Sequence, residues 1–207
     1  MPSIWLEVVK AIRAVRRARF LILAIALTHA VAVATGAVMV HAGNGIALSY
    51  RDRLVTQARA SDPVSLASQQ GDDLRAAFIE TLRTEWACAA TGITGLTIVS
   101  PFVLSAYRGW VGGIVSVDSS HVSRLIDLGQ AIYYLSVLVL QLIPYSLAAG
   151  AGVNLGLTYF RPRADYQGER WIGYPKEAIW DFVRILVLII PFVVVANLWE
   201  FPSPLNR

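Results

Sequence analysis

The hydrophobic pattern divides the chain into four long apolar stretches separated by more polar segments. The stretches cover roughly residues 20–41, 86–107, 127–160 and 182–199. A helix rises about 1.5 Å per residue and the hydrocarbon core of a bilayer is about 30 Å thick, so about 20 apolar residues are enough to cross it. Backbone amides in lipid must be satisfied within the segment itself, which favours helices. The pattern predicts an all-α, polytopic helical membrane protein.

The first apolar stretch, residues 20–41, contains no Asp, Glu, Lys or Arg. A basic segment precedes it and Ala42 and Gly43 follow it, as in a secretory signal. The apolar core of a signal peptide is about 7–15 residues long, however, and this stretch is about 22. We interpret residues 20–41 as an uncleaved membrane span.

Residues 1–19 combine apolar positions at helical spacing with a basic face. This pattern is typical of a helix that lies on a membrane surface, where the cations meet anionic headgroups. A helix docked on a partner subunit would show the same pattern. The predicted membrane-surface residues are Lys10, Arg13, Arg16, Arg17 and Arg19.

Between the first two stretches, residues 42–84 form the main hydrophilic loop, which we place outside the cell. Asp72 or Asp73 is suited to cap a helix that leads into the span at 86–107, and Pro101 should kink that span. The loop is too short for a domain with its own core. The whole chain, residues 1–207, is therefore expected to be a single integral membrane domain.

The stretch at 127–160 is too long for one crossing, because as a single helix it would measure about 50 Å. Pro144 lies at its middle, and the small residues 148–152 follow, so we predict a broken or re-entrant helix pair around Pro144. Lys and Arg are more frequent on the cytoplasmic side of membrane proteins. With the helix pair, 12 Lys and Arg lie on the cytoplasmic side and 6 outside. With one crossing, 8 lie on the cytoplasmic side and 10 outside, so the pair is favoured. The prediction is about five membrane segments, a cytoplasmic N-terminus, a cytoplasmic loop at 161–181 and a last span at 182–199.

Composition and charge agree with a membrane protein. Hydrophobic residues make up 56% of the chain and charged residues 15%, with a mean hydropathy of +0.54, whereas soluble domains carry about 25% charged residues. The net charge of +4 is modest, and basic residues gather at the membrane borders. This favours anionic lipid headgroups over nucleic acid as a partner.

The sequence offers little chemistry. Cys88 is the only cysteine, so the chain has neither an intrachain disulfide nor a cysteine cluster for a metal. His29 has no histidine at helical spacing, and the segment from Asp118 to His121 reads as a polar loop rather than a triad. No catalytic residue, metal or cofactor is predicted. Gln141, at membrane depth before Pro144, is expected to hydrogen-bond a neighbouring helix or the carbonyls freed by Pro144, with contact to a substrate or ion as the alternative.

Two parts of the C-terminal half resemble the stage II sporulation protein M family of bacterial integral membrane proteins. That family carries E-L-P-A, small residues and G-L-R-L-G before a basic loop; here Gln141 and Leu142, then Ala148 to Gly156, fall in the same register. The family's closing pattern, A-x-x-x-E before a proline, is similar to Ala196 through Glu200. The chain departs from it with Gln141 for glutamate and Asn154 for a frequent arginine.

This resemblance implies a non-enzymatic subunit that scaffolds or completes a larger complex in the bacterial inner membrane. The founding member works with cell-wall hydrolases, and relatives lie near transporter genes. A permease-like subunit of an ABC-type transporter is the alternative, and an accessory subunit of an energy-converting complex is a second one. The implied partners are other membrane subunits or a second copy of the chain. The residues expected to make polar packing or partner contacts are Gln141, Asn154, Arg184, Asn197 and Glu200.

Overall fold

The computed structural model describes residues 4–161, 166 and 168–202. It is 82% helical, which confirms the predicted all-α class. The elements, in chain order, are α1 (Ile4–His41), α2 (Gly45–Ser61), α3 (Pro63–Gln69), α4 (Asp73–Thr94), the 3₁₀ turn η1 (Gly95–Thr97), α5 (Ser100–Ile114), α6 (Leu128–Phe160), β1 (Arg170–Trp171), β2 (Tyr174–Pro175) and α7 (Lys176–Glu200).

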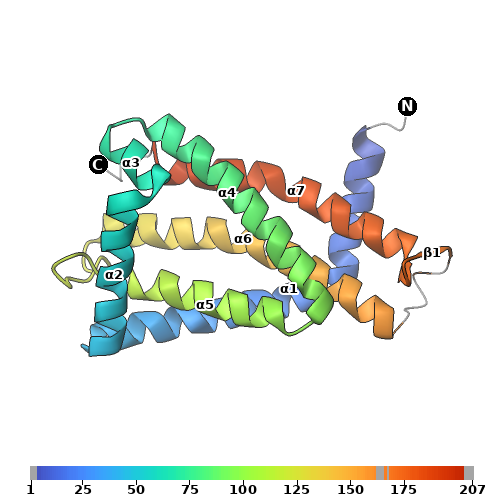
Figure 1. The fold of residues 1–207 in the computed structure, drawn as a ribbon, viewed down its shortest axis with the longest axis horizontal. Helices are drawn as coiled ribbons and strands as arrows, with labels where there is room; N and C mark the ends of the chain where they lie inside the picture. Colours follow the sequence, from blue (N-terminus) through green and yellow to red (C-terminus); the bar gives the residue numbers. More distant parts are fainter. Residues whose placement is uncertain (1–3, 162–165, 167, 203–207) are drawn as a thin grey trace.

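The helices form an elongated bundle (Figure 1). Most of α1, together with α5, α6 and α7, runs along the long axis, and α4 crosses the bundle diagonally. At one end lie the first turns of α1, which run across the bundle, and the β1–β2 hairpin; α2 lies across the opposite end. Among the described residues, three helices, α1, α6 and α7, are long and apolar enough to cross a membrane. The chain is thus a helical membrane protein.

The predicted break at Pro144 is wrong, because α6 is one continuous helix of 33 residues with Pro144 inside it. A proline in a helix interior removes one backbone hydrogen bond and crowds the preceding turn, a local penalty of about 3 kcal/mol. Every residue from Pro144 to Gly156 is buried. Burial of that whole segment outweighs the local penalty, so the helix continues through the proline.

The predicted span at 86–107 is also wrong as a single helix, because it is divided by a turn. Here α4 ends at Thr94, η1 follows, and α5 begins at Ser100. Pro101 occupies the first turn of α5, where its missing N–H leaves no helical hydrogen bond unmade. Ile98 adopts a positive φ of 65° within the turn. The pair of helices expected around Pro144 is therefore formed by α4 and α5.

Glycines bring the helices into backbone contact. A Cβ added at Gly152 of α6 would overlap the carbonyl of Gly92 in α4, and one at Gly113 of α5 would overlap the carbonyl of Val33 in α1. Such close approach is available only to residues without a side chain. The small residues of 148–156 serve that purpose within this one chain.

The polar segment at 42–84 is largely helical. It contains α2, α3 and the first turns of α4. Asn44 caps α2 by accepting from the amides of Ile46 and Ala47, both at 3.1 Å. The predicted cap of α4 is confirmed, since the Asp72 side chain accepts from the amide of Arg75 at 3.2 Å.

Candidate functional site

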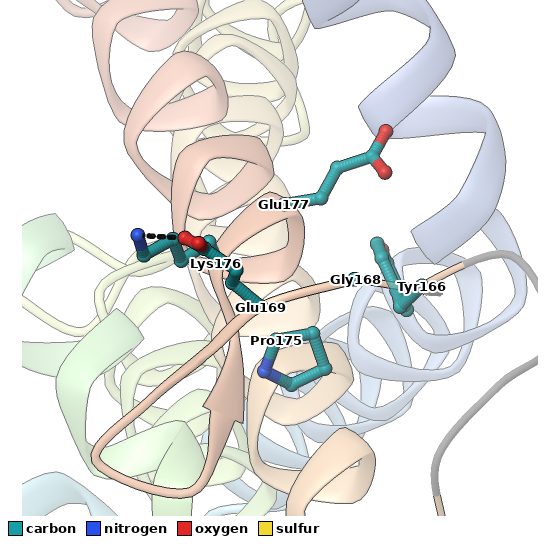
Figure 2. Close-up of a pocket in the computed structure, with 6 residues that line it drawn as sticks. All are labelled: Tyr166, Gly168, Glu169, Pro175, Lys176 and Glu177. Atoms are coloured by element: carbon teal, nitrogen blue, oxygen red, sulfur yellow. Dashed lines mark hydrogen bonds and ion pairs between the residues drawn. The ribbon is translucent and has the colours of Figure 1, made fainter.

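A small pocket of about 250 Å³ lies where the chain enters α7 (Figure 2). It is lined by Tyr166, Gly168, Glu169, Pro175, Lys176 and Glu177. The Lys176 ammonium pairs with the Glu169 carboxylate, whereas Glu177 points away from that pair and binds Arg17 of α1 at 2.9 Å. The charges around the pocket are thus already paired within the protein. Its volume is also below the roughly 300–1,000 Å³ of typical ligand sites.

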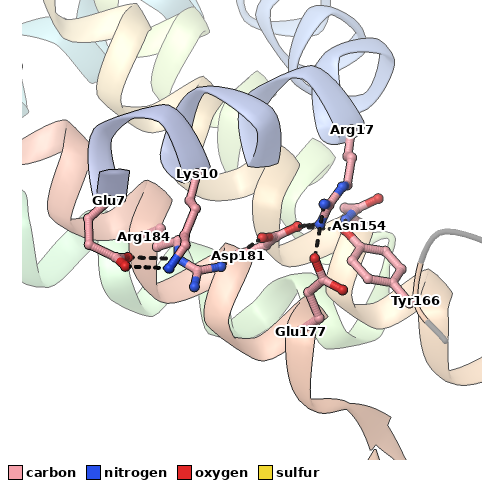
Figure 3. A network of polar contacts seen from close by, with 8 residues as sticks. All are labelled: Glu7, Lys10, Arg17, Asn154, Tyr166, Glu177, Asp181 and Arg184. Atoms are coloured by element: carbon pink, nitrogen blue, oxygen red, sulfur yellow. Dashed lines mark hydrogen bonds and ion pairs between the residues drawn. The ribbon is translucent and has the colours of Figure 1, made fainter. Parts of the chain in front are cut away.

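Beside the pocket, a network of polar contacts joins α1, α6 and α7 (Figure 3). Its centre is Asp181, which is only 3% exposed. The Asp181 carboxylate accepts from Arg17 at 2.6 Å, from Arg184 at 3.3 Å and from the Tyr166 hydroxyl at 3.1 Å. A buried carboxylate is tolerated only where cations and donors replace water. We call this set of contacts, with those of Asn154, Glu7, Lys10 and Glu177, the ionic junction.

Helical spacing explains why these side chains converge. Glu177, Asp181 and Arg184 follow one another at intervals of four and three residues, so they share one face of α7. That face meets the first turns of α1, where Arg17 reaches Asp181. Glu7 accepts from Arg184 at 3.3 Å and from Lys10 at 2.6 Å, which extends the ionic junction along α1.

The contribution of α6 is Asn154. Its amide donates to the Tyr166 hydroxyl at 2.9 Å, and that hydroxyl in turn donates to Asp181. Burial raises the pKa of the Tyr166 hydroxyl, and the neighbouring Asp181 carboxylate raises that pKa further. Tyr166 therefore keeps its proton at neutral pH and remains a donor, so the relay from α6 to α7 stays intact.

The other predicted contact residues form a second cluster at the opposite end of α7. Gln141 of α6 donates to the Glu200 carboxylate at 2.7 Å. Asn197, which is buried, donates to the Thr81 hydroxyl of α4 at 3.3 Å. These bonds tie the end of α7 to α6 and α4, as expected of polar residues within a bundle.

The five predicted basic residues divide into two groups. Lys10 and Arg17 take part in the ionic junction. Arg13, Arg16 and Arg19 are exposed, and within the described part of the chain no carboxylate lies within 4 Å of them. The exposed three are therefore available to an external anion.

Sequence reasoning missed Asp181 and Tyr166, the central members of the ionic junction. For Asp181 a signal existed, because an aspartate four residues after Glu177 and three before Arg184 gives a charged helix face at the entrance to an apolar span. For Tyr166 we find no such signal. Sequence reasoning also missed Arg108. Its guanidinium lies 3.9 Å from the centre of the Tyr145 ring, a cation–π contact between α5 and α6.

The remaining polar groups do not assemble into a metal centre. In the described residues no group of three or more His, Cys, Asp and Glu side chains lies close enough to hold a metal ion. His29 is buried in α1, and its Nδ1 has no hydrogen-bond partner among those residues. Cys88 is buried as a free thiol.

Comparison with known proteins identifies the chain at the level of a family. The family model of Stage II sporulation protein M matches residues 21–201, which includes all three long apolar helices and both polar clusters apart from the first turns of α1. No curated protein and no solved structure matches the chain. The chain belongs to the Stage II sporulation protein M family.

Proposed function

We propose that this protein is a non-enzymatic subunit that scaffolds a larger complex in the bacterial inner membrane. The observation that carries the proposal is the ionic junction, in which the charged groups of α1 and α7 bind one another. Groups engaged in this way hold helices in fixed positions and are not available to a substrate. The outer faces of the long helices remain apolar and exposed, for example at Leu23, Leu27 and Val31, and such faces suit lipid or the helices of partner subunits.

The test is gentle detergent purification of the tagged protein from its native membrane, followed by native mass spectrometry. We expect discrete additional subunits in fixed ratio to this chain. The matched variants are Asp181→Asn, which weakens the ionic junction, and Glu177→Gln, which alters its exposed edge. We expect Asp181→Asn to release partner subunits and Glu177→Gln to retain them. A lone monomer or homodimer would contradict the proposal and favour the permease alternative.

The same proposal assigns Arg13, Arg16 and Arg19 to the anionic headgroups of the cytoplasmic leaflet. The exposure of the three arginines supports this assignment. The apolar side chains of Trp5, Ile12 and Phe20 are also exposed on the same part of α1 and suit a membrane surface. Each basic side chain near an anionic surface contributes about 1 kcal/mol.

The check is retention of phosphatidylglycerol relative to phosphatidylcholine on the purified protein. Alanine substitution of the three arginines should abolish the preference for phosphatidylglycerol. The control removes three exposed arginines at the other end of the molecule, Arg53, Arg59 and Arg75, and should leave that preference unchanged. Equal effects of the two triple variants would refute the assignment.

A further inference from the structure

The β1–β2 hairpin ends in two exposed apolar side chains. Arg170 pairs with Pro175 and Trp171 with Tyr174, so Ile172 and Gly173 form the two-residue turn. Trp171 is 62% exposed and Ile172 is 84% exposed. We call residues 171–173 the hairpin tip. Neither of its large side chains is substantially buried by the rest of the protein.

Turn geometry does not account for isoleucine at this position. Ile172 has a φ of 53° and Gly173 a φ of 84°. Positive φ at both central residues is the type I′ pattern, for which Asn-Gly is the favoured sequence. A β-branched residue with positive φ is strained. The fold therefore holds an apolar side chain in solvent at a position where an asparagine would fit better.

The hairpin lies at the end of the bundle where α6 ends and α7 begins, with Gly173 against the Tyr159 ring of α6 and the side chains of Trp171 and Ile172 exposed. The end of α6 and the start of α7 both extend beyond the first turns of α1, and the hairpin lies between these two helices in the chain (Figure 1). When those turns of α1 lie on the membrane surface, as the proposed function has it, the hairpin tip lies beyond the headgroups on the aqueous side. This position favours a protein over the membrane as the partner of the tip.

The charge next to the hairpin tip is positive. Arg161 and Arg170 are exposed, and in the portion that the structure describes neither has a carboxylate within 4 Å. Of the nearby acidic side chains that the structure describes, Glu169 is paired with Lys176 and Glu177 with Arg17. A complementary surface would therefore carry negative charge.

We propose that the hairpin tip is an anchor that inserts into an apolar pocket, edged by acidic side chains, on a water-soluble partner protein. Exposed tryptophan flanked by arginine is the composition of side chains that dominate binding in protein interfaces. The inference rests on the proposed function, because it names the surface through which the subunit would bind a further component on the cytoplasmic side.

The test uses the single buried cysteine of the protein. Cys88 is 0% exposed, so in Ile172→Cys a water-soluble maleimide reports on the hairpin tip alone. The labelling rate is measured in opened native membranes and in vesicles of phosphatidylethanolamine and phosphatidylglycerol that contain only this protein. Ile126→Cys is the control, since Ile126 is 78% exposed in the loop before α6. The labelling rates of Ile126→Cys in native membranes and in vesicles show how far the two preparations differ for a position outside the hairpin tip.

We expect Ile172→Cys to react about tenfold more slowly in native membranes than in vesicles, because an interface anchor is desolvated. Adding Arg170→Glu should restore the fast rate. Slow labelling in both preparations would mean that lipid covers the hairpin tip, and fast labelling in both would mean that nothing does. Either result overturns the proposal. If Ile172→Cys labels fast in both preparations while other subunits still co-purify with the protein, the anchor proposal fails and the proposed function stands.

A second variant separates binding from folding. Ile172→Asn keeps the turn and relieves its strain, so thermal stability should be unchanged or higher while the partner is lost from the purified complex. Reduced stability of the purified protein would show that Ile172 acts within the fold. That result, or retention of every partner at wild-type levels, would overturn the proposal.

Discussion

Asp181 shows how one ionised residue can hold three parts of a helical membrane protein together. It receives hydrogen bonds from α1, from its own helix α7 and, through Tyr166, from α6. A buried carboxylate gains little over an apolar residue as long as its partners are present, but removal of one partner leaves an uncompensated charge. The ionic junction therefore fixes which surfaces meet.

Replacing Asp181 by asparagine should destabilise the protein strongly. The Arg17 guanidinium would lose its buried carboxylate partner, and breaking a buried ion pair in this way costs about 3–5 kcal/mol. Glu177→Gln is the control, because the Glu177 side chain is 46% exposed and exposed pairs contribute about 0–1 kcal/mol. Denaturant unfolding of the detergent-solubilised protein measures both. Similar losses in the two variants would contradict this role of Asp181.

The Gln141–Glu200 pair gives a prediction that separates hydrogen bonding from charge. Gln141→Glu restores the residue type of the family pattern, but it places a second carboxylate against Glu200 and should destabilise the end of α7. The double variant Gln141→Glu with Glu200→Gln exchanges the two groups and should recover most of the loss. Thermal unfolding of the wild type, the two single variants Gln141→Glu and Glu200→Gln, and the double variant measures the coupling between the two residues. Additive effects would show that the 2.7 Å contact is not important.

At the scale of elements, the sequence predicts which segments are helical better than where a helix turns. The long apolar runs and the Asp72 cap were predictable because each depends on local composition or spacing. The position of the turn was not. Pro144 is a stronger local breaker than the residues at 95–99, yet every residue from Pro144 to Gly156 is buried. Such burial depends on helices distant in sequence.

The same distinction applies to the candidate site. Asn154 and Arg184 could be named because polar residues within apolar runs are conspicuous. The contacts across the ionic junction could not be named. Arg184 and Glu7 are 177 positions apart and Arg17 and Asp181 are 164 apart, and both contacts depend on α1 turning across α7. Conversely, Arg17 looks from sequence like its neighbours Arg16 and Arg19, and only packing distinguishes their roles.

Close approach of α4 to α6 can be tested at one glycine. Gly152→Ala adds a methyl group where the carbonyl of Gly92 lies, so the two helices must separate, and overpacking of this kind typically costs about 1–3 kcal/mol. Gly45→Ala is the control, because a Cβ at Gly45 meets nothing within 4 Å. Heat-induced unfolding should distinguish the variants. A Gly152→Ala protein as stable as Gly45→Ala would mean that the helices are less tightly packed.

At the scale of the whole molecule, two errors in the predicted path cancel. One crossing at 86–107 followed by a hairpin at 127–160 reverses the chain as often as the α4–α5 pair followed by the continuous helix α6. Both paths place residues 161–181 at the same end as residues 1–19, and Figure 1 shows the β1–β2 hairpin at the end where α1 begins. Relocation of the turn takes Arg108 and Arg124 off the cytoplasmic side, so the count becomes 10 Lys and Arg inside against 8 outside. The sidedness stays a prediction.

This parity leads to a prediction about the two faces of the membrane. Ile126 precedes α6 and Ile172 follows it, so a single crossing by α6 must place them on opposite sides. In sealed vesicles, an impermeant maleimide should label Ile126→Cys from the outer side and Ile172→Cys from the cytoplasmic side, with Cys88 silent because it is buried. The control is labelling after detergent opens the vesicles, when both positions should react. Labelling of both cysteines from one side would mean that α6 does not cross the membrane. The chain would then have to turn back within 127–160.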